Sequence, residues 1–191
     1  MSIPRTLRIR NAAPGDETGI FRLIGELAQF ERLEHQLTGT EERLAEHLFD
    51  QPPRAECLVA EAVSEPGQVG GLKEPASSAP ASAGAAKALV GYALFFTTYS
   101  TFLTQPGLWL EDVFVTEMLR GRGIGRALLS AVAEQARLRG AGRLEWSVLD
   151  WNDRAIRFYQ SQGAQLLPDW RICRMGRDVL ACVNPEAAGG V

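Results

Sequence analysis

Apolar and polar residues follow two different spacings along this chain, and together the spacings predict an α/β fold. Near the N-terminus, Leu7 and Ile9 alternate with arginines, which is the two-residue period of a strand. Apolar residues then recur at helical spacing between positions 20 and 28, which predicts a helix with one buried face. Asp16 is placed to cap that helix at its start.

A second helix is predicted from about Thr40 to the prolines at 52 and 53. Thr38 and Glu41 have capping-box spacing, and Thr40 competes with Thr38 as the cap. Further strands are predicted at 57–60, 89–98, 108–115, 144–149 and 171–174, and further helices at 123–139 and 152–162. The order is mixed α/β, with hairpins in the middle of the chain and strand–helix units later.

Residues 64–87 interrupt this pattern with a run rich in Ala, Gly, Ser and Pro. Such a composition offers little apolar surface to bury, so it predicts a flexible insert loop. Too little chain precedes it for an independent domain, and the strands on either side look like hairpin partners. We therefore expect a single domain over 1–191, with 184–191 as a frayed tail.

Composition and charge narrow the class of protein. The chain has 191 residues, with 23 acidic and 20 basic residues and a formal net charge of −3. A nucleic-acid-binding domain would carry a clustered basic surplus, so no nucleic-acid partner is expected. Neither a signal peptide nor a run near the ~18 apolar residues of a membrane span is present, so we expect a cytoplasmic protein without a membrane partner.

The cysteines and histidines give no metal-binding pattern. Cys57, Cys173 and Cys182 are odd in number and widely spaced, which favours neither a disulfide framework nor a zinc site. His35 and His47 each lie in a polar stretch, and both are interpreted as surface residues. No metal is expected.

A glycine-rich segment, RGRGIG at 120–125, lies between a predicted strand and a predicted helix. Small residues let backbone N–H groups approach an anion, and the start of the following helix favours negative charge at the same place. Arg120, Arg122 and Arg126 add positive charge. The segment matches neither a Walker A loop nor a dinucleotide-binding fingerprint. It predicts a pyrophosphate cradle, and the alternative interpretation is a plain tight turn.

Two adjacent carboxylates, Glu111 and Asp112, interrupt the apolar strand LWLEDVFV. Burial of a carboxylate in such a strand is costly unless the group is ion-paired or hydrogen-bonded, or serves in binding or catalysis. Because adjacent strand residues face opposite sides, at most one of them is expected to face a given cavity. The alternative to a functional role is a structural ion pair with an arginine.

Arg120, Gly123 and Gly125 match the R-x-x-G-x-G signature of the GNAT acetyltransferase superfamily. The segments 26–34, 108–115, 120–125 and 149–165 resemble the spermidine/spermine N-acetyltransferase family, and YST at 99–101 resembles its thialysine N-epsilon-acetyltransferase branch. The resemblance covers residues 7–175 except the insert. It implies the GNAT acyl-CoA N-acyltransferase fold, a mixed and mostly antiparallel central sheet, splayed near its middle, with helices on both faces.

The resemblance also implies a mechanism without a metal. Acetyl-CoA is the acetyl donor, and the substrate amine attacks it directly after losing a proton with help from Glu111. Tyr159 matches the tyrosine that protonates the departing thiolate, which suits a phenol because its ordinary pKa lies above that of a thiol. The alternative for Tyr159 is a core aromatic, since Ala155, Phe158 and Tyr159 have helical spacing.

Contact residues carried over from the family fall into two groups. The coenzyme contacts implied are Val113, Phe114, Val115, Arg120, Gly121, Arg122, Gly123, Ile124, Gly125, Arg126, Asn152, Arg154 and Ala155. The substrate contacts implied are Phe30, Glu31, Glu111, Asp112, Glu145 and Trp146. For 152–155 the alternative is simple helix capping, and for Glu31 it is an ordinary exposed glutamate.

One departure from the family bears on the substrate. Where polyamine-acetylating relatives carry an aspartate and a tryptophan, this chain has Ser100 and Phe102, so one carboxylate for a long polycation is missing. The missing carboxylate therefore favours a shorter primary amine, such as a lysine analogue or a diamine. Separately, the resemblance implies a homodimer. The alternatives are a polyamine acetyltransferase, a protein N-acetyltransferase and a CoA-binding regulatory module without turnover.

Overall fold

The computed structural model describes residues 6–63 and 88–183 of the chain. The chain divides into two compact units, Met1–Ser147 and Val148–Val191, and each is described by itself. The predicted insert loop at 64–87 and the predicted tail at 184–191 lie outside the described residues. The single domain expected from the sequence stays a prediction.

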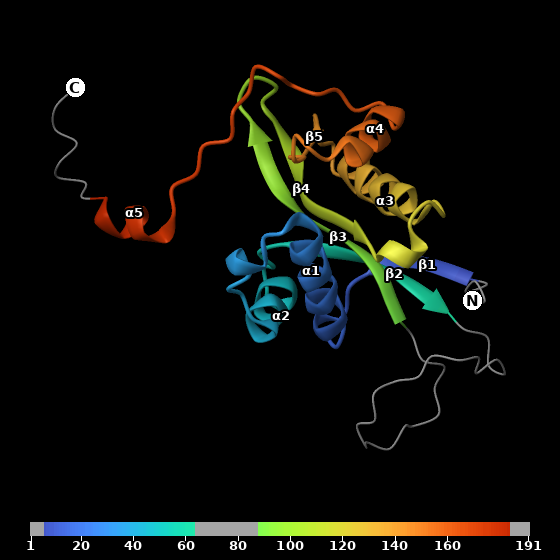
Figure 1. Ribbon diagram of the computed structural model, residues 1–191. Helices are drawn as coiled ribbons and strands as arrows, with labels where there is room; N and C mark the ends of the chain where they lie inside the picture. Colours follow the sequence, from blue (N-terminus) through green and yellow to red (C-terminus); the bar gives the residue numbers. More distant parts are fainter. Residues whose placement is uncertain (1–5, 64–87, 184–191) are drawn as a thin grey trace, which may run out of the picture. The chain divides into compact units, whose positions relative to one another are not determined.

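The first unit contains most of the regular structure (Figure 1). Its elements are β1 (Thr6–Asn11), α1 (Glu17–Glu31), the 3-10 turn η1 (Glu34–Gln36), α2 (Glu41–Phe49), β2 (Glu56–Val63), β3 (Ala88–Ser100), β4 (Gln105–Val115), the 3-10 turn η2 (Glu117–Leu119), α3 (Ile124–Leu138) and β5 (Leu144–Glu145). The second unit contains α4 (Asp153–Ser161) and α5 (Arg177–Cys182).

The strands form one sheet in the order β1-β2-β3-β4-β5. The pairs β1–β2, β2–β3 and β3–β4 are antiparallel, and β4–β5 is parallel. The predicted hairpin partners on either side of the insert, β2 and β3, are therefore confirmed. The mixed, mostly antiparallel sheet of the GNAT fold is confirmed as well.

Helices cover both faces of this sheet, as expected: α1 and α2 lie on one face and α3 on the other (Figure 1). On the α1 face, Ile20 and Leu23 are fully buried in a cluster with Tyr92 and Phe114. On the α3 face, strand and helix approach closely at Gly91, where an added Cβ would lie 2.7 Å from the backbone of β4 and 3.3 Å from a side chain of α3. That position therefore requires glycine.

Two predicted strands differ from the structure. The strand predicted at 144–149 ends at Glu145, because β4 and β5 stop pairing there. The strand predicted near 171–174 is absent, and those residues have no regular structure before α5 begins at Arg177. Both segments alternate like strands, but a strand persists only where a neighbour completes its hydrogen-bond ladder.

The helix caps also differ in part from the prediction. Thr40 is the cap of α2, with its hydroxyl accepting a hydrogen bond from the Arg43 amide at 3.3 Å, so the alternative cap Thr38 is wrong. Asp16 occupies the N-cap position of α1 but makes no side-chain cap bond to that helix. Its carboxylate instead accepts from the Ala13 amide at 2.8 Å and binds Arg10.

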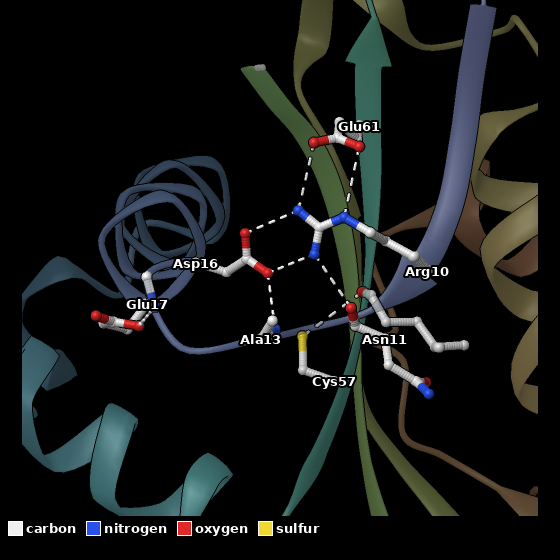
Figure 2. A network of polar contacts seen from close by, with 9 residues as sticks. Arg10, Asn11, Ala13, Asp16, Glu17, Cys57 and Glu61 are labelled. Atoms are coloured by element: carbon white, nitrogen blue, oxygen red, sulfur yellow. Dashed lines mark hydrogen bonds and ion pairs between the residues drawn. The ribbon is translucent and has the colours of Figure 1, made fainter. Parts of the chain in front are cut away.

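Arg10 holds the start of α1 against the sheet, as Figure 2 shows. Its guanidinium donates to Asp16 at 2.5 and 2.9 Å and to Glu61 of β2 at 3.4 Å. Glu61 is only 1% exposed, and a buried carboxylate is stable as an ion only with such partners. The hydrogen bonds to Asp16 and Glu61 raise the pKa of Arg10 above its ordinary value. The network fixes one end of α1, and the other end carries Phe30 and Glu31.

Candidate active site

Strand β4 carries one extra residue, Glu111, relative to its neighbour. Leu94 of β3 pairs with Asp112 and Phe95 pairs with Leu110, so Glu111 has no partner residue across the β3–β4 ladder. Such an extra residue is a β-bulge, which bends the strand and changes which face the following side chains occupy. The carboxylate that the sequence assigned to proton transfer therefore lies at the irregular point of the sheet.

The bulge places both adjacent carboxylates on one face. Trp109 pairs with Phe96 and Asp112 pairs with Leu94, two residues apart on β3, so Trp109 and Asp112 share a face. On that face the Trp109 indole Nε1 donates to Glu111 Oε2 at 2.9 Å. The regular alternation expected for these two residues is wrong, because the bulge interrupts the strand at Glu111. The expectation that at most one of them faces a given cavity stays a prediction.

This shared face is the one covered by α1. The Tyr92 hydroxyl donates to Asp112 Oδ2 at 3.1 Å, and Tyr92 belongs to the core cluster that contains Ile20 and Leu23 of α1. Burial raises the pKa of Asp112 to about 6; the hydrogen bond from Tyr92 opposes the shift, and the charges of Glu111 and Glu31 add to it. Burial, followed by the Asp112 charge, raises the pKa of Tyr92 well above its ordinary value.

We expect Asp112→Asn to stabilise the protein at neutral and alkaline pH. Because folding raises the pKa of this carboxyl from 3.8 to about 6, the charged form costs stability above pH 6. The amide keeps an acceptor for Tyr92, so the gain in unfolding free energy should be about 1–3 kcal/mol at pH 8. As the pH falls from 6 towards 4, the folded wild type takes up the proton first, and the gain should fade.

Denaturant unfolding of both proteins at pH 4, 6 and 8 would measure this. Asp153→Asn, a change of the same kind at an exposed position, serves as the control. An equal difference between wild type and Asp112→Asn at all three pH values would contradict the raised pKa.

The far end of α1 contributes two of the predicted substrate residues. Phe30 and Glu31 are the last two residues of the helix, which ends at Arg32 in the left-handed conformation with φ 60°. Burial raises the pKa of Glu31, and its charge acts on both Asp112 and Tyr92. The end of α1 and the bulge of β4 therefore form one acidic site.

The glycine-rich segment forms a turn that only glycine adopts easily. Gly121 and Gly123 have φ of 79° and 83°, and an added Cβ at either would meet no atom within 4 Å. Backbone conformation therefore requires these glycines, and the space beside them is open. Gly123 is the N-cap of α3, which has no side-chain cap, and the first intrahelical bond is donated by Ala127 to Gly123 O.

This turn has the features of an anion site at a helix start. The amides of Ile124 and Gly125 precede the helical ladder of α3, and they lie at the end of the helix that attracts negative charge. Arg122 and Arg126 are both exposed beside them. The structure thus brings together the loop features that the sequence predicted for a pyrophosphate cradle.

Arg120 is engaged differently from the other loop arginines. Its Nε donates to the Val115 carbonyl at 2.9 Å. Its guanidinium carbon lies 4.4 Å from the Phe30 ring centroid and 5.2 Å from that of Phe114. The side chain therefore contacts β4 and the end of α1.

Strands β4 and β5 pair over only two residues, Leu108–Leu144 and Trp109–Glu145. Among the described residues, no strand pairs with β4 on this side beyond Trp109. The backbone of 113–115, predicted to pair with the pantetheine arm, lies along this unpaired edge. The separation of β4 and β5 that the family implies is thus present. One backbone group in this stretch, the Val115 carbonyl, accepts a hydrogen bond from Arg120.

Glu145 and Trp146 lie where β5 ends. Glu145 pairs in register with Trp109, so its side chain is on the face of the two carboxylates. It forms an ion pair with Arg143 at 2.7 Å, which offsets part of its charge. Trp146 is half-buried and directly follows the last paired residue.

The second unit carries the remaining predicted residues. Tyr159 lies in α4, with its ring centroid 5.2 Å from that of Phe158. Asn152 caps α4, because its Oδ1 accepts from the Ala155 amide at 3.1 Å. The capping role that the sequence offered as the alternative for 152–155 is therefore present, and Arg154 lies in the first turn of the same helix.

Sequence reasoning missed two residues of the site, Trp109 and Tyr92. Tyr92 looks like an ordinary core aromatic within a buried strand, and only its hydroxyl contact reveals the role. Trp109 lies two residues before Glu111, a spacing that a strand places on one face, and this signal was available in the sequence.

The two residues that differ from polyamine-acetylating relatives, Ser100 and Phe102, lie at the turn between β3 and β4. Ser100 is 2% exposed, and its Oγ accepts from the Leu103 amide at 3.2 Å in the turn between β3 and β4. Phe102 is 94% exposed at the tip of that turn. Ser100 therefore has a structural contact, and no carboxylate lies at either position.

Two further observations concern the described residues. Within 6–63 and 88–183, no group of three or more His, Cys, Asp or Glu side chains is arranged to hold a metal ion. Among the helices in those ranges, none has the length and apolar character needed to cross a membrane.

Comparisons with known proteins bear on the family and the fold of this chain. The sequence profile of the acetyltransferase (GNAT) family matches residues 30–164. L-ornithine N5-acetyltransferase of Arabidopsis thaliana is 36% identical, over 93% of this chain and 87% of its own. Thialysine N-epsilon-acetyltransferase of Mus musculus is 38% identical, over 85% and 86%. The fold is similar to that of an integron cassette protein of V. cholerae, with a TM-score of 0.64 and 20% identity over 92% of this chain and 95% of that one.

Proposed function

Since this chain belongs to the GNAT acetyltransferase family, we propose that it transfers the acetyl group of acetyl-CoA to a primary amine of a small cationic substrate. The observation that carries the proposal is the bulge at Glu111. It places Glu111 and Asp112 on the same face of the sheet, against the end of α1 that carries Glu31. A cluster of carboxylates suits an ammonium group, and an adjacent proton acceptor suits the conversion of that group to a nucleophile.

The acceptor is proposed to be a short diamine or a lysine-like amino acid. Relatives that cover most of this chain are named for ornithine and thialysine, which both carry a primary amine on a short side chain. Glu31 and Asp112 would attract the cation, while Glu145 is partly neutralised by Arg143. Phe30 and Trp146 would flank the aliphatic part. The absence of a carboxylate at Ser100 and Phe102 favours a shorter amine than spermidine.

The glycine-rich turn fits the pyrophosphate of acetyl-CoA. Open space beside Gly121 and Gly123 and the uncapped start of α3 leave room for an anion, and Arg122 and Arg126 supply charge. The unpaired edge of β4 over 113–115 suits the pantetheine arm. The resemblance to the family proposes Asn152, Arg154 and Ala155, in the second unit, as a further contact region. When bound, acetyl-CoA supplies an acetyl thioester, which a neutral amine can attack directly.

The proton transfers are proposed for two residues, Glu111 on β4 and Tyr159 on α4, from the resemblance to the family. Glu111 takes a proton from the substrate ammonium, directly or through a water, and Trp109 holds the carboxylate in place through its indole N–H. Backbone amides along β4 polarise the carbonyl that is attacked. Tyr159 gives its phenolic proton to the departing thiolate and then takes up the second proton that the substrate nitrogen loses as the amide forms, while Glu111 releases its proton to solvent. The predicted homodimer and the cytoplasmic location belong to the same proposal.

A CoA-release assay across acceptor amines tests the proposal. Ornithine, thialysine, lysine, putrescine, spermidine and a lysine-containing peptide would be compared with acetyl-CoA in excess, with mass spectrometry of each product. We expect kcat/KM to be at least about tenfold higher for ornithine or thialysine than for spermidine, because a long polycation lacks its additional carboxylate here.

Other outcomes of this assay identify the alternatives. A preference for spermidine would favour a polyamine acetyltransferase, and a preference for the peptide would favour a protein N-acetyltransferase. Binding of acetyl-CoA without turnover of any amine would favour a regulatory module, and the catalytic roles proposed above would be wrong.

A further inference from the structure

We propose that Arg120 is a positioning residue for the amine site, and that its guanidinium holds the end of α1 in place. This role rests on the proposed function of the acidic site. The family signature places Arg120 in the coenzyme loop, so the sequence alone predicts a contact with phosphate. The contacts of the side chain point instead to the helix that carries Phe30 and Glu31.

The Arg120 side chain connects three elements. It starts from the loop before α3, donates from Nε to the Val115 carbonyl on β4 at 2.9 Å, and places its guanidinium 4.4 Å from the Phe30 ring of α1. The Phe114 ring lies 5.2 Å away. A planar guanidinium stacks on aromatic rings while it donates a hydrogen bond from its edge, and an ammonium lacks this combination.

The backbone of Arg120 is likewise engaged within the protein. Its N–H donates to the Glu117 carbonyl at 3.1 Å, which closes the 3-10 turn η2. The left-handed turn that opens the loop towards an anion begins only at the next residue, Gly121. Arg122, two residues on, is exposed beside that turn. Phosphate contact is therefore assigned to the loop from Gly121 onwards.

The position of the end of α1 depends on this contact. Arg10 fixes the start of the helix, but Phe30 is 38% exposed and Glu31 is the final helical residue. Without the guanidinium, Phe30 loses a charged partner on its ring face, and Glu31 can move relative to Asp112. The amine site should loosen while the glycine-rich turn keeps its shape.

Steady-state kinetics of three variants separate an amine-positioning role of Arg120 from a phosphate-binding role. Arg120→Ala should raise the KM for ornithine or thialysine about tenfold with a smaller change in kcat, because the end of α1 then positions the amine less well. Arg122→Ala should raise the KM for acetyl-CoA and leave the amine KM unchanged. Arg120→Lys should behave like Arg120→Ala towards the amine, because the stacking plane is lost. A rise confined to the acetyl-CoA KM in Arg120→Ala would overturn the proposal.

Hydrogen exchange tests the same role without any activity. In the unliganded protein, the amides of Arg32 and Leu33 bond to Gln29 O and Ala28 O and close the end of α1. These two amides should exchange faster in Arg120→Lys than in wild type. Their exchange rates should be unchanged in Arg122→Ala, and the exchange rates of the β2 amides should be unchanged in both variants. Unaltered exchange at Arg32 and Leu33 would overturn the positioning role. If no amine is turned over by wild type, the proposed function fails, and this measurement still decides the contact.

Discussion

Replacement of Tyr159 by phenylalanine should lower kcat by about 10²- to 10³-fold, with little change in either KM. The variant removes one hydroxyl and keeps the ring, so the packing of the residue with Phe158 is retained. What is lost is the proton for the departing thiolate, and general acid–base groups contribute rate factors of this size. Initial rates of CoA release at saturating acetyl-CoA and ornithine would measure the effect.

The control for this prediction is Tyr99→Phe. Tyr99 is 60% exposed on β3, and removal of its hydroxyl should leave kcat unchanged. If Tyr159→Phe keeps more than about half of the wild-type kcat, Tyr159 is a packing residue of α4 and not the acid of the reaction. Such a result would favour the core-aromatic interpretation that helical spacing also allows.

Replacement of Glu111 by glutamine should lower kcat/KM for the amine by about 10²-fold at pH 7.5. A lysine-like amine has an ordinary pKa near 10.4, so only about one molecule in a thousand is a nucleophile at that pH. The wild type overcomes this by accepting the proton at Glu111. The variant depends on amine that is already neutral, so the deficit should narrow as the pH rises towards 10.

A pH profile of kcat/KM for wild type and Glu111→Gln between pH 6.5 and 9.5 would test this. Glu117→Gln is the matched control, since Glu117 is exposed in η2, beyond the end of β4. A deficit that stays constant with pH would indicate that Glu111 only attracts the cation. No deficit at any pH would remove Glu111 from the mechanism.

Local features of the chain could be predicted from the sequence because they depend on neighbouring residues. Alternation predicted β1, short apolar-rich segments predicted the other strands, apolar residues at helical spacing predicted α1 and α3, and Thr40 was one of the two predicted caps of α2. The turn at 121–123 needs backbone conformations that glycine adopts, so the glycines themselves identified it. The segment 171–174 was the clear failure, since alternation alone does not provide a partner strand.

The candidate site was found in the sequence as a set of residues, while its geometry was only partly predictable. Glu111 and Asp112 were selected because charges interrupt an apolar strand, yet regular alternation assigned them to opposite faces. The bulge that brings them together is a property of the β3–β4 register. The roles of Tyr159 and Glu111 stay predictions until the variants are measured.

By itself, the sequence determined the α/β class, the acetyltransferase family and the identity of the glycine-rich turn, because each of these is encoded in short-range spacing and composition. The tertiary structure alone decided that Trp109 and Tyr92 hold the two carboxylates, that β4 and β5 separate beyond Trp109, and that Arg120 reaches Phe30. These features join residues that are distant in the chain or out of regular register. They depend on how strands pair and helices pack, which a local pattern does not contain.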